Sequence, residues 1–228
     1  MRSKAKGSRK KKRIAGKIST YIILALIAVI CAGPFIWLLL SSLRTGANIY
    51  SLHFSLKDFS ISNYTGVIEY MDLGKYIWNT IVVTLGGIII DVLFSSMCAY
   101  PLAVMDFKGK KIIFGLLVAT MIIPAAAGMI INYLTISKMH LLNTLLGVIL
   151  PTSVSTFSII LMRQAYLGIP RELIEAAKID GAGELRIWAT IMIPGIMPSI
   201  STVVIFDFIK NWNAFLWPII VLQDPEKY

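Results

Sequence analysis

Charged residues and cysteines are both scarce in this sequence, and each scarcity excludes a class of protein. Charged side chains make up 15% of the 228 residues and hydrophobic ones 57%, whereas a soluble globular domain is about a quarter charged. The composition therefore excludes a soluble globular fold. The cysteines, Cys31 and Cys98, lie inside apolar runs, where nothing favours a disulfide.

The sequence signatures of common enzymes are missing as well. The chain contains no H-E-x-x-H metal motif, no G-x-S-x-G nucleophile elbow and no P-loop, the patterns of metalloproteases, serine hydrolases and nucleotide-binding proteins. His53 and His140 stand apart from any acidic or cysteine cluster, so no metal site is expected. The sequence predicts neither a catalytic site nor a cofactor, and any ATP hydrolysis must occur on a separate subunit.

Long apolar runs take the place of those motifs. A membrane-spanning helix needs about 20 apolar residues, and five runs of this length follow one another, interrupted by a charge at Asp91 alone. We therefore expect an all-α, polytopic membrane protein in which a basic tail, residues 1–17, precedes a transmembrane domain, residues 18–228. The predicted spans are residues 18–43, 76–105, 112–137, 139–162 and 187–206.

The formal charge of +10 is concentrated in the tail before the first span. Nucleic-acid binding would favour aromatic side chains among the basic ones, and residues 1–17 contain none. A basic segment beside a spanning helix is typical of a cytoplasmic end held against anionic lipid. The following apolar run is longer than the roughly 7 to 15 residues of a cleavable signal, so it is expected to remain as an anchor.

The connections between spans alternate in lysine and arginine density. Residues 106–111 and 163–187 are rich in these cations and are predicted inside, whereas residues 44–75 balance them with acids and are predicted outside. The chain then reaches Tyr228 on the outside, after an apolar stretch, residues 217–222, that is too short to cross. We expect a sixth span beyond this point.

The inside connection 163–187 has the signals of a short helix followed by a sharp turn. Pro170 suits a helix start, Asp180 a helix end, and Gly181 a left-handed turn, with a second helix beginning near Gly183. The predicted helix has a narrow apolar strip, and it is too short to span a membrane. It either docks in a groove of a partner protein or lies at the membrane interface. The strip is formed by Leu173, Ile174, Ala176 and Ala177, and an ion pair between Glu175 and Lys178 is expected from their i, i+3 spacing.

This segment resembles the EAA loop of bacterial ABC-importer permeases. The family pattern is E-A-A, two residues, D-G-A, and a Leu-Pro-like pair about a dozen residues later. It corresponds to Glu175-Ala176-Ala177, Asp180-Gly181-Ala182 and Ile193-Pro194, where Ile replaces the usual Leu. Residues 141–144, 149–151 and 212–218 further resemble the carbohydrate-uptake, maltose-transporter type of permease.

The resemblance implies an inner-membrane permease subunit with six spans and a cytoplasmic amino terminus. It implies three protein partners: an ATPase subunit whose cleft holds the short helix, a second permease subunit, and an extracytoplasmic solute-binding protein. The transported solute would be a sugar or an oligosaccharide. The coupling residues carried over from the motif are Glu175, Ala176, Ala177, Asp180, Gly181 and Ala182.

A few further residues are candidates for the substrate path. Asp91 is an ionisable group inside a span, which suggests a function because its burial is costly, although hydroxyl groups of a neighbouring helix could also satisfy it. Trp212, Asn213 and Trp217 could stack on and hydrogen-bond a sugar. An aromatic belt at the membrane interface explains the tryptophans equally well without a ligand.

An ion-coupled secondary transporter is the alternative to the ABC permease. Such a protein places several ionisable residues within its spans to bind or relay ions. Only Asp91 and, marginally, Asp207 meet that condition in this sequence, and a secondary transporter needs no docking helix.

Overall fold

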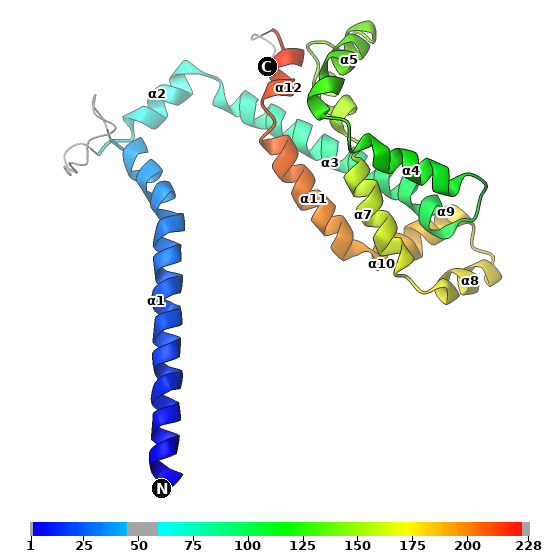
Figure 1. The fold of residues 1–228 in the computed structure, drawn as a ribbon. Helices are drawn as coiled ribbons and strands as arrows, with labels where there is room; N and C mark the ends of the chain where they lie inside the picture. Colours follow the sequence, from blue (N-terminus) through cyan, green and yellow to red (C-terminus); the bar gives the residue numbers. More distant parts are fainter. Residues whose placement is uncertain (1, 45–58, 225–228) are drawn as a thin grey trace. The chain divides into compact units, whose positions relative to one another are not determined.

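The computed structural model describes residues 2–44 and 59–224, with the side chains of 2–15 and of Ala125 outside the description. Residues 45–58 of the predicted outer connection 44–75, and His53 among them, therefore lie outside the described residues. The described part is helical and contains no strand, which confirms the all-α prediction. The chain divides into two units, Met1–Leu73 and Gly74–Tyr228, and Figure 1 gives the order of their helices.

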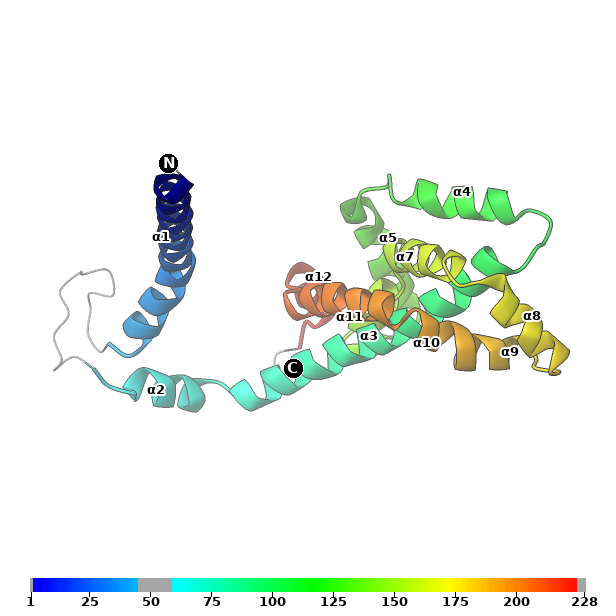
Figure 2. The ribbon, with the colours of Figure 1, turned by 90° about the horizontal axis from the view of Figure 1, so that it is seen from below.

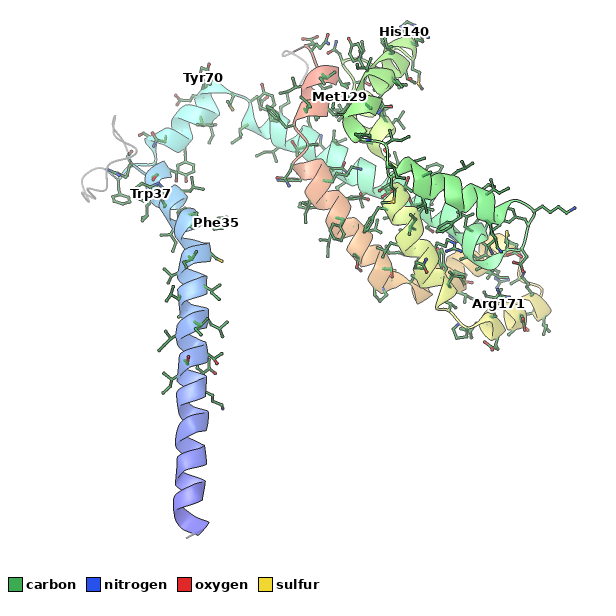
Figure 3. The ribbon with its side chains drawn as sticks, viewed as in Figure 1. Phe35, Trp37, Tyr70, Met129, His140 and Arg171 are labelled. Carbon is green, nitrogen blue, oxygen red and sulfur yellow. The ribbon has the colours of Figure 1, made fainter. Side chains whose placement is uncertain are left out.

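The first unit consists of one long helix and one short one. Helix α1 (Arg2–Ser42) contains Pro34, and α2 is Ser62–Tyr70. From residue 16 onward the apolar side chains of α1 project all round the helix, as Figure 3 shows. No residue in its most apolar stretch of 18 residues is buried. Residues Gly16–Ser42 are long and apolar enough to cross a membrane, as predicted for 18–43. A helix that is apolar on every side is suited to lipid rather than water.

The second unit is arranged around α3 (Leu73–Val104), whose 32 residues also qualify as a membrane span. This helix confirms the prediction for residues 76–105. One side of α3 packs into the main buried cluster, which also contains residues from α7 (Thr156–Leu167), α8 (Arg171–Ile179), η3 (Trp188–Met192) and α11 (Met197–Trp212). In both Figure 1 and Figure 2, α7 and α11 lie beside one another.

The remaining predicted spans are broken at or near prolines, although Pro34 and Pro101 lie inside the unbroken helices α1 and α3. Pro124 separates the predicted span 112–137 into two helices, and further breaks bend the α6–α7 pair by 51° and the α9–α11 pair by 78°. Each proline lacks a backbone donor and its ring clashes with the preceding turn. Two described helices are long enough to span alone, or up to four if each bent pair is one span, so the predicted count of five spans is not confirmed. The pieces are α4 (Lys110–Thr120), α5 (Ala125–Lys138), α6 (Leu145–Ile149), η2 (Leu150–Thr152), α7 (Thr156–Leu167), α9 (Glu184–Ile187), η3 (Trp188–Met192), α10 (Ile193–Gly195), α11 (Met197–Trp212) and α12 (Leu216–Val221).

The second unit has two distinct ends. Helix α8 (Arg171–Ile179) lies with α9 at one end, and α12 and α5 lie at the other, in both ribbon views (Figures 1 and 2). Helix α3 runs between these ends. The two ends, one at α8 and the other at α12, are thus connected by a single continuous helix.

Candidate functional site

Helix α8 begins and ends where its local sequence signals lie. Pro170 has an extended ψ of 131° and precedes the first helical residue, and Glu172 occupies the first turn, where a carboxylate favours the helix dipole. Asp180 closes the helix, and Gly181 follows with a φ of +78°. The predicted short helix and left-handed turn are both confirmed, with α8 one residue shorter at each end than expected.

The predicted apolar strip of α8 is divided between two faces. Ile174 and Ala177 are 7% and 9% exposed and belong to the chain's own buried cluster. Leu173 is 51% exposed and Ile179 86%, and Ala176 is exposed beside them. The methyl group of Ala177 therefore packs inside this chain and does not face a partner, so that part of the strip interpretation was wrong. The outer face is formed by Leu173, Ala176 and Ile179.

Lys178 at the end of α8 forms an ion pair with Glu184, at 2.7 Å between Nζ and Oε1. The i, i+3 spacing predicted a pair with Glu175. In the structure the Lys178 ammonium instead pairs with a carboxylate of the next helix, α9. Tyr100 of α3 donates its hydroxyl to the other Glu184 oxygen at 2.5 Å. Sequence reasoning missed this junction because Tyr100 and Glu184 are separated by 84 positions.

A small cavity of about 140 Å³ lies between α8 and the bundle. Arg171, Glu175 and Lys178 of α8 line it together with Tyr166 of α7 and Ala103 of α3. Glu175, the first residue of the E-A-A motif, therefore stands at the rim between the helix and its own core, whereas Ala176 faces outward.

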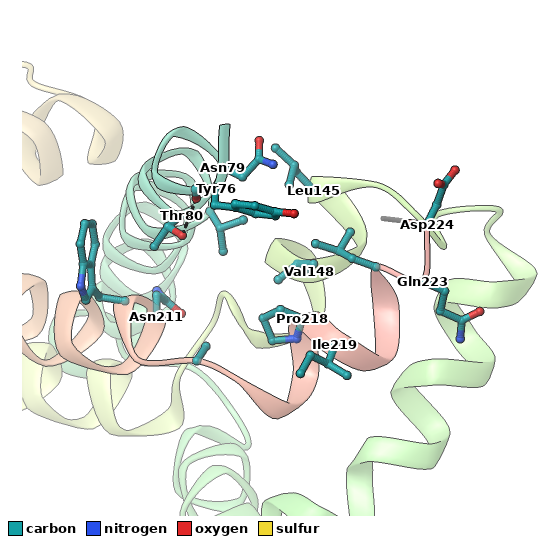
Figure 4. A pocket seen from close by; sticks show the side chains of 14 residues that line it. Tyr76, Asn79, Thr80, Leu145, Val148, Asn211, Pro218, Ile219, Gln223 and Asp224 are labelled. Atoms are coloured by element: carbon teal, nitrogen blue, oxygen red, sulfur yellow. Dashed lines mark hydrogen bonds between the residues drawn. The ribbon is translucent and has the colours of Figure 1, made fainter. Parts of the chain in front are cut away.

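A larger pocket of about 500 Å³ lies at the opposite end of the unit. It is lined by the start of α3, by α6, by the end of α11 and by α12, and Figure 4 shows Tyr76, Asn79 and Thr80 on one side with Pro218 and Ile219 on the other. The Asn79 Nδ2 atom is buried and has no hydrogen-bond partner among the described residues. The pocket thus combines an apolar wall with a few amide and hydroxyl groups, the composition of a small-molecule site.

The structure brings only one of the four predicted substrate-path residues to this pocket. Trp212 lines it, and its ring stacks on Phe208 with centroids 5.3 Å apart. Trp217 is 9% exposed and donates its indole N–H to the Val148 carbonyl at 3.2 Å. Asn213 donates back to the Ile209 carbonyl of its own helix at 2.7 Å.

The fourth, Asp91, lies in the middle of α3 and is 1% exposed. Its Oδ1 accepts from the Ser95 hydroxyl at 2.5 Å and from the Ser155 backbone N–H at 2.8 Å. Its Oδ2 accepts from the Ser158 hydroxyl at 2.5 Å. Asp91 thus has the hydrogen-bond donors that the second interpretation expected, in which hydroxyl groups of a neighbouring helix satisfy the buried acid. Asp207 of α11 is 4% exposed, and its Oδ2 atom is buried without a hydrogen-bond partner among the described residues.

Comparison of the sequence with known proteins identifies its family. Residues 91–226 match the family described as binding-protein-dependent transport system inner membrane component. The chain belongs to this family. It is 33% identical to the arabinooligosaccharides transport system permease protein AraQ of Bacillus subtilis, over 93% of this chain and 77% of that one. It is 32% identical to the diacetylchitobiose uptake system permease protein NgcG of Streptomyces coelicolor, over 92% and 70%.

The fold of this permease also has a solved counterpart. A bacterial ABC transporter involved in the import of the acidic polysaccharide alginate contains a chain that superposes with a TM-score of 0.83 at 28% identity, covering 94% of this chain and 76% of that one. The permease is therefore a multi-pass component of the bacterial inner membrane with the fold of an ABC importer permease. Within the importer it is the membrane component and not a catalytic subunit.

Proposed function

We propose that this permease, together with a second permease subunit, forms the path through which a sugar or an oligosaccharide enters the cell. A separate ATPase subunit supplies the energy, and an extracytoplasmic binding protein delivers the solute. The named relatives transport arabinooligosaccharides and diacetylchitobiose, and the solved transporter imports alginate. The observation that carries the proposal is the placement of α8 at one end of the helical unit and of α12, which lines the large pocket, at the other (Figures 1 and 2).

In this proposal the outer face of α8 docks in a cleft of the ATPase. Ile179 and Leu173 expose apolar surface at the end of the unit, and Ala176 between them is small enough for close approach. Short amphipathic helices commonly bind by laying such a face in a groove. Gly181 sets the angle of α8 to the following helix, Ala177 and Ala182 pack on the bundle side, and Glu175 lines the small cavity beside them, whereas Asp180 is exposed at the end of the helix.

The proposed topology has five spans in this chain, with α8 and the amino terminus in the cytoplasm. The spans are α1, α3, the α4–α5 pair and the two bent pairs. The lysine and arginine distribution along the sequence supports this orientation. Single cysteines in 163–187, in a variant lacking Cys31 and Cys98, should resist an impermeant thiol reagent in intact cells and react after the membrane is opened.

The large pocket is the proposed outer part of the sugar path. Tyr76 and Trp212 offer aromatic faces, while Asn79, Asn211 and Gln223 offer amide groups. A polyol needs both, because its hydroxyls require hydrogen-bond partners and its C–H faces require apolar contact.

Purification from native membranes tests the assembly. A tagged permease extracted in mild detergent should copurify with a second permease subunit and with an ATPase that carries a P-loop. A permease that purifies without them, and that takes up sugar in response to an ion gradient alone, would instead be a secondary transporter.

A further inference from the structure

The carboxylate of Glu184 lies where α8 meets the bundle. One oxygen pairs with Lys178 of α8 at 2.7 Å, and the other accepts from Tyr100 of α3 at 2.5 Å. Glu184 itself is the first residue of α9. Three helices therefore converge on a single side chain, and each of its oxygens serves a different one.

The Tyr100 side of this junction is fixed within the bundle. Tyr100 is 5% exposed and its ring meets that of Tyr166 edge to face, with centroids 6.1 Å apart. The Tyr166 hydroxyl hydrogen-bonds with the Ser96 hydroxyl at 3.0 Å, and Trp188 donates its indole N–H to the same Ser96 oxygen at 2.8 Å. Tyr100 thus has little freedom to follow Glu184 without moving its neighbours.

The Lys178 side belongs to the segment that the ATPase would move. Ile174 and Ala177 of α8 also pack into the buried cluster, through apolar contacts that are non-directional. A charge-assisted hydrogen bond is stronger and directional. The Lys178–Glu184–Tyr100 series, in which the Lys178 and Glu184 side chains are 49% and 41% exposed, therefore gives the link between α8 and α3 a defined direction.

We propose that Glu184 is a positioning residue that transfers the movement of α8 to α3. The inference rests on the proposed docking of α8 on an ATPase subunit. Helix α3 has 32 residues, which is about 48 Å at the rise of an α-helix. Its other end carries Tyr76, Asn79 and Thr80, which line the large pocket. A shift of α3 at Tyr100 would thus reach the sugar path.

The test uses the full transporter, reconstituted in proteoliposomes with its ATPase, second permease and binding protein. The measured quantity is the number of sugar molecules taken up per ATP hydrolysed. Glu184→Gln and Tyr100→Phe should each lower this ratio by about five-fold or more, the low end of typical coupling between sites. The ATPase should remain bound in wild-type amount, because the outer face of α8 is unchanged. Glu69→Gln, the same substitution on an exposed position of α2, is the matched control and should leave the ratio unchanged.

Exchanging the two charges distinguishes a loss of coupling between α8 and α3 from a general loss of folding. Lys178→Glu and Glu184→Lys should each lower the ratio, and the double exchange should recover much of it because the ion pair is restored with its signs reversed. Wild-type ratios in Glu184→Gln and Tyr100→Phe would overturn the inference. If the wild-type permease itself binds no ATPase, the proposed function fails, and this outcome is distinct from altered coupling in an assembled complex.

Discussion

The Ser158 hydroxyl of α7 donates a 2.5 Å hydrogen bond to the Asp91 carboxylate of α3. Asp91 also accepts from Ser95 on its own helix and from the Ser155 backbone at the start of α7. A buried carboxylate is stable only when its oxygens have donors. Asp91 is thus a buried polar connection between α3 and α7.

Removal of this carboxylate should destabilise the permease. Asp91→Ala leaves three donors without their acceptor, and each orphaned buried donor costs about 1–3 kcal/mol. Thermal unfolding in detergent should show the largest loss for Asp91→Ala, a smaller loss for Asp91→Asn, and the smallest for Ser158→Ala. If Asp91→Ala unfolds at the wild-type temperature and instead weakens sugar binding, Asp91 belongs to the substrate path.

Gly181 should tolerate no β-branched side chain. Its φ of +78° costs an L-residue about 1–2 kcal/mol, although an added Cβ would meet no atom of the described residues within 4 Å. Gly181→Val should insert normally and lose sugar uptake, since the turn after α8 is displaced. Gly183→Val is the matched control, because Gly183 has an ordinary φ of −73° and equally open space. Equal uptake by both variants would exclude the turn as a coupling element.

Ala176 and Ala177 should respond in opposite ways to a bulky side chain. Ala176→Trp should fold with wild-type stability and fail to retain the ATPase, because this position is on the exposed face of α8. Ala177→Trp should destabilise the permease itself, by about 1–3 kcal/mol or more, because the position is buried. Unfolding temperature and ATPase retention, measured on the same two preparations, distinguish them. Retention of the ATPase by Ala176→Trp would place the docking face elsewhere.

Trp212 should affect sugar uptake without affecting assembly. Trp212→Ala removes the exposed aromatic face of the large pocket. We expect the apparent affinity for sugar to fall about tenfold, which corresponds to about 1.4 kcal/mol of binding free energy. Phe215→Ala is the control, because Phe215 is 73% exposed and does not line the pocket. Initial uptake rates over a range of sugar concentrations give the comparison. An unchanged affinity in Trp212→Ala would favour an aromatic-belt role.

The sequence was most informative where structure depends on near neighbours. Pro170, Asp180 and Gly181 act within one or two turns of the backbone, so the bounds of α8 and its left-handed turn could be predicted closely. Hydropathy also located α1 and α3. Hydropathy did not show that the other apolar runs are broken. An average of side-chain hydropathy contains no information on the bend that a proline introduces into the backbone.

Long-range partners could not be predicted from local spacing. The i, i+3 rule assigned Lys178 to Glu175, but a helix surface pair contributes only a few tenths of a kcal/mol. The Glu184 carboxylate also receives the Tyr100 hydroxyl, which fixes it within reach of the ammonium. Likewise, two of the donors around Asp91, from Ser155 and Ser158, are 64 and 67 positions away along the chain.

ATP-dependent sugar accumulation is the most direct measurement of the central claim. The purified assembly, in proteoliposomes without any ion gradient, is given labelled oligosaccharide, the binding protein and either ATP or a non-hydrolysable analogue on the ATPase side. We expect accumulation with ATP and none with the analogue. Equal accumulation with both, or uptake that appears only when a proton or sodium gradient is imposed, would contradict the assignment of this chain as the ATP-driven importer's permease.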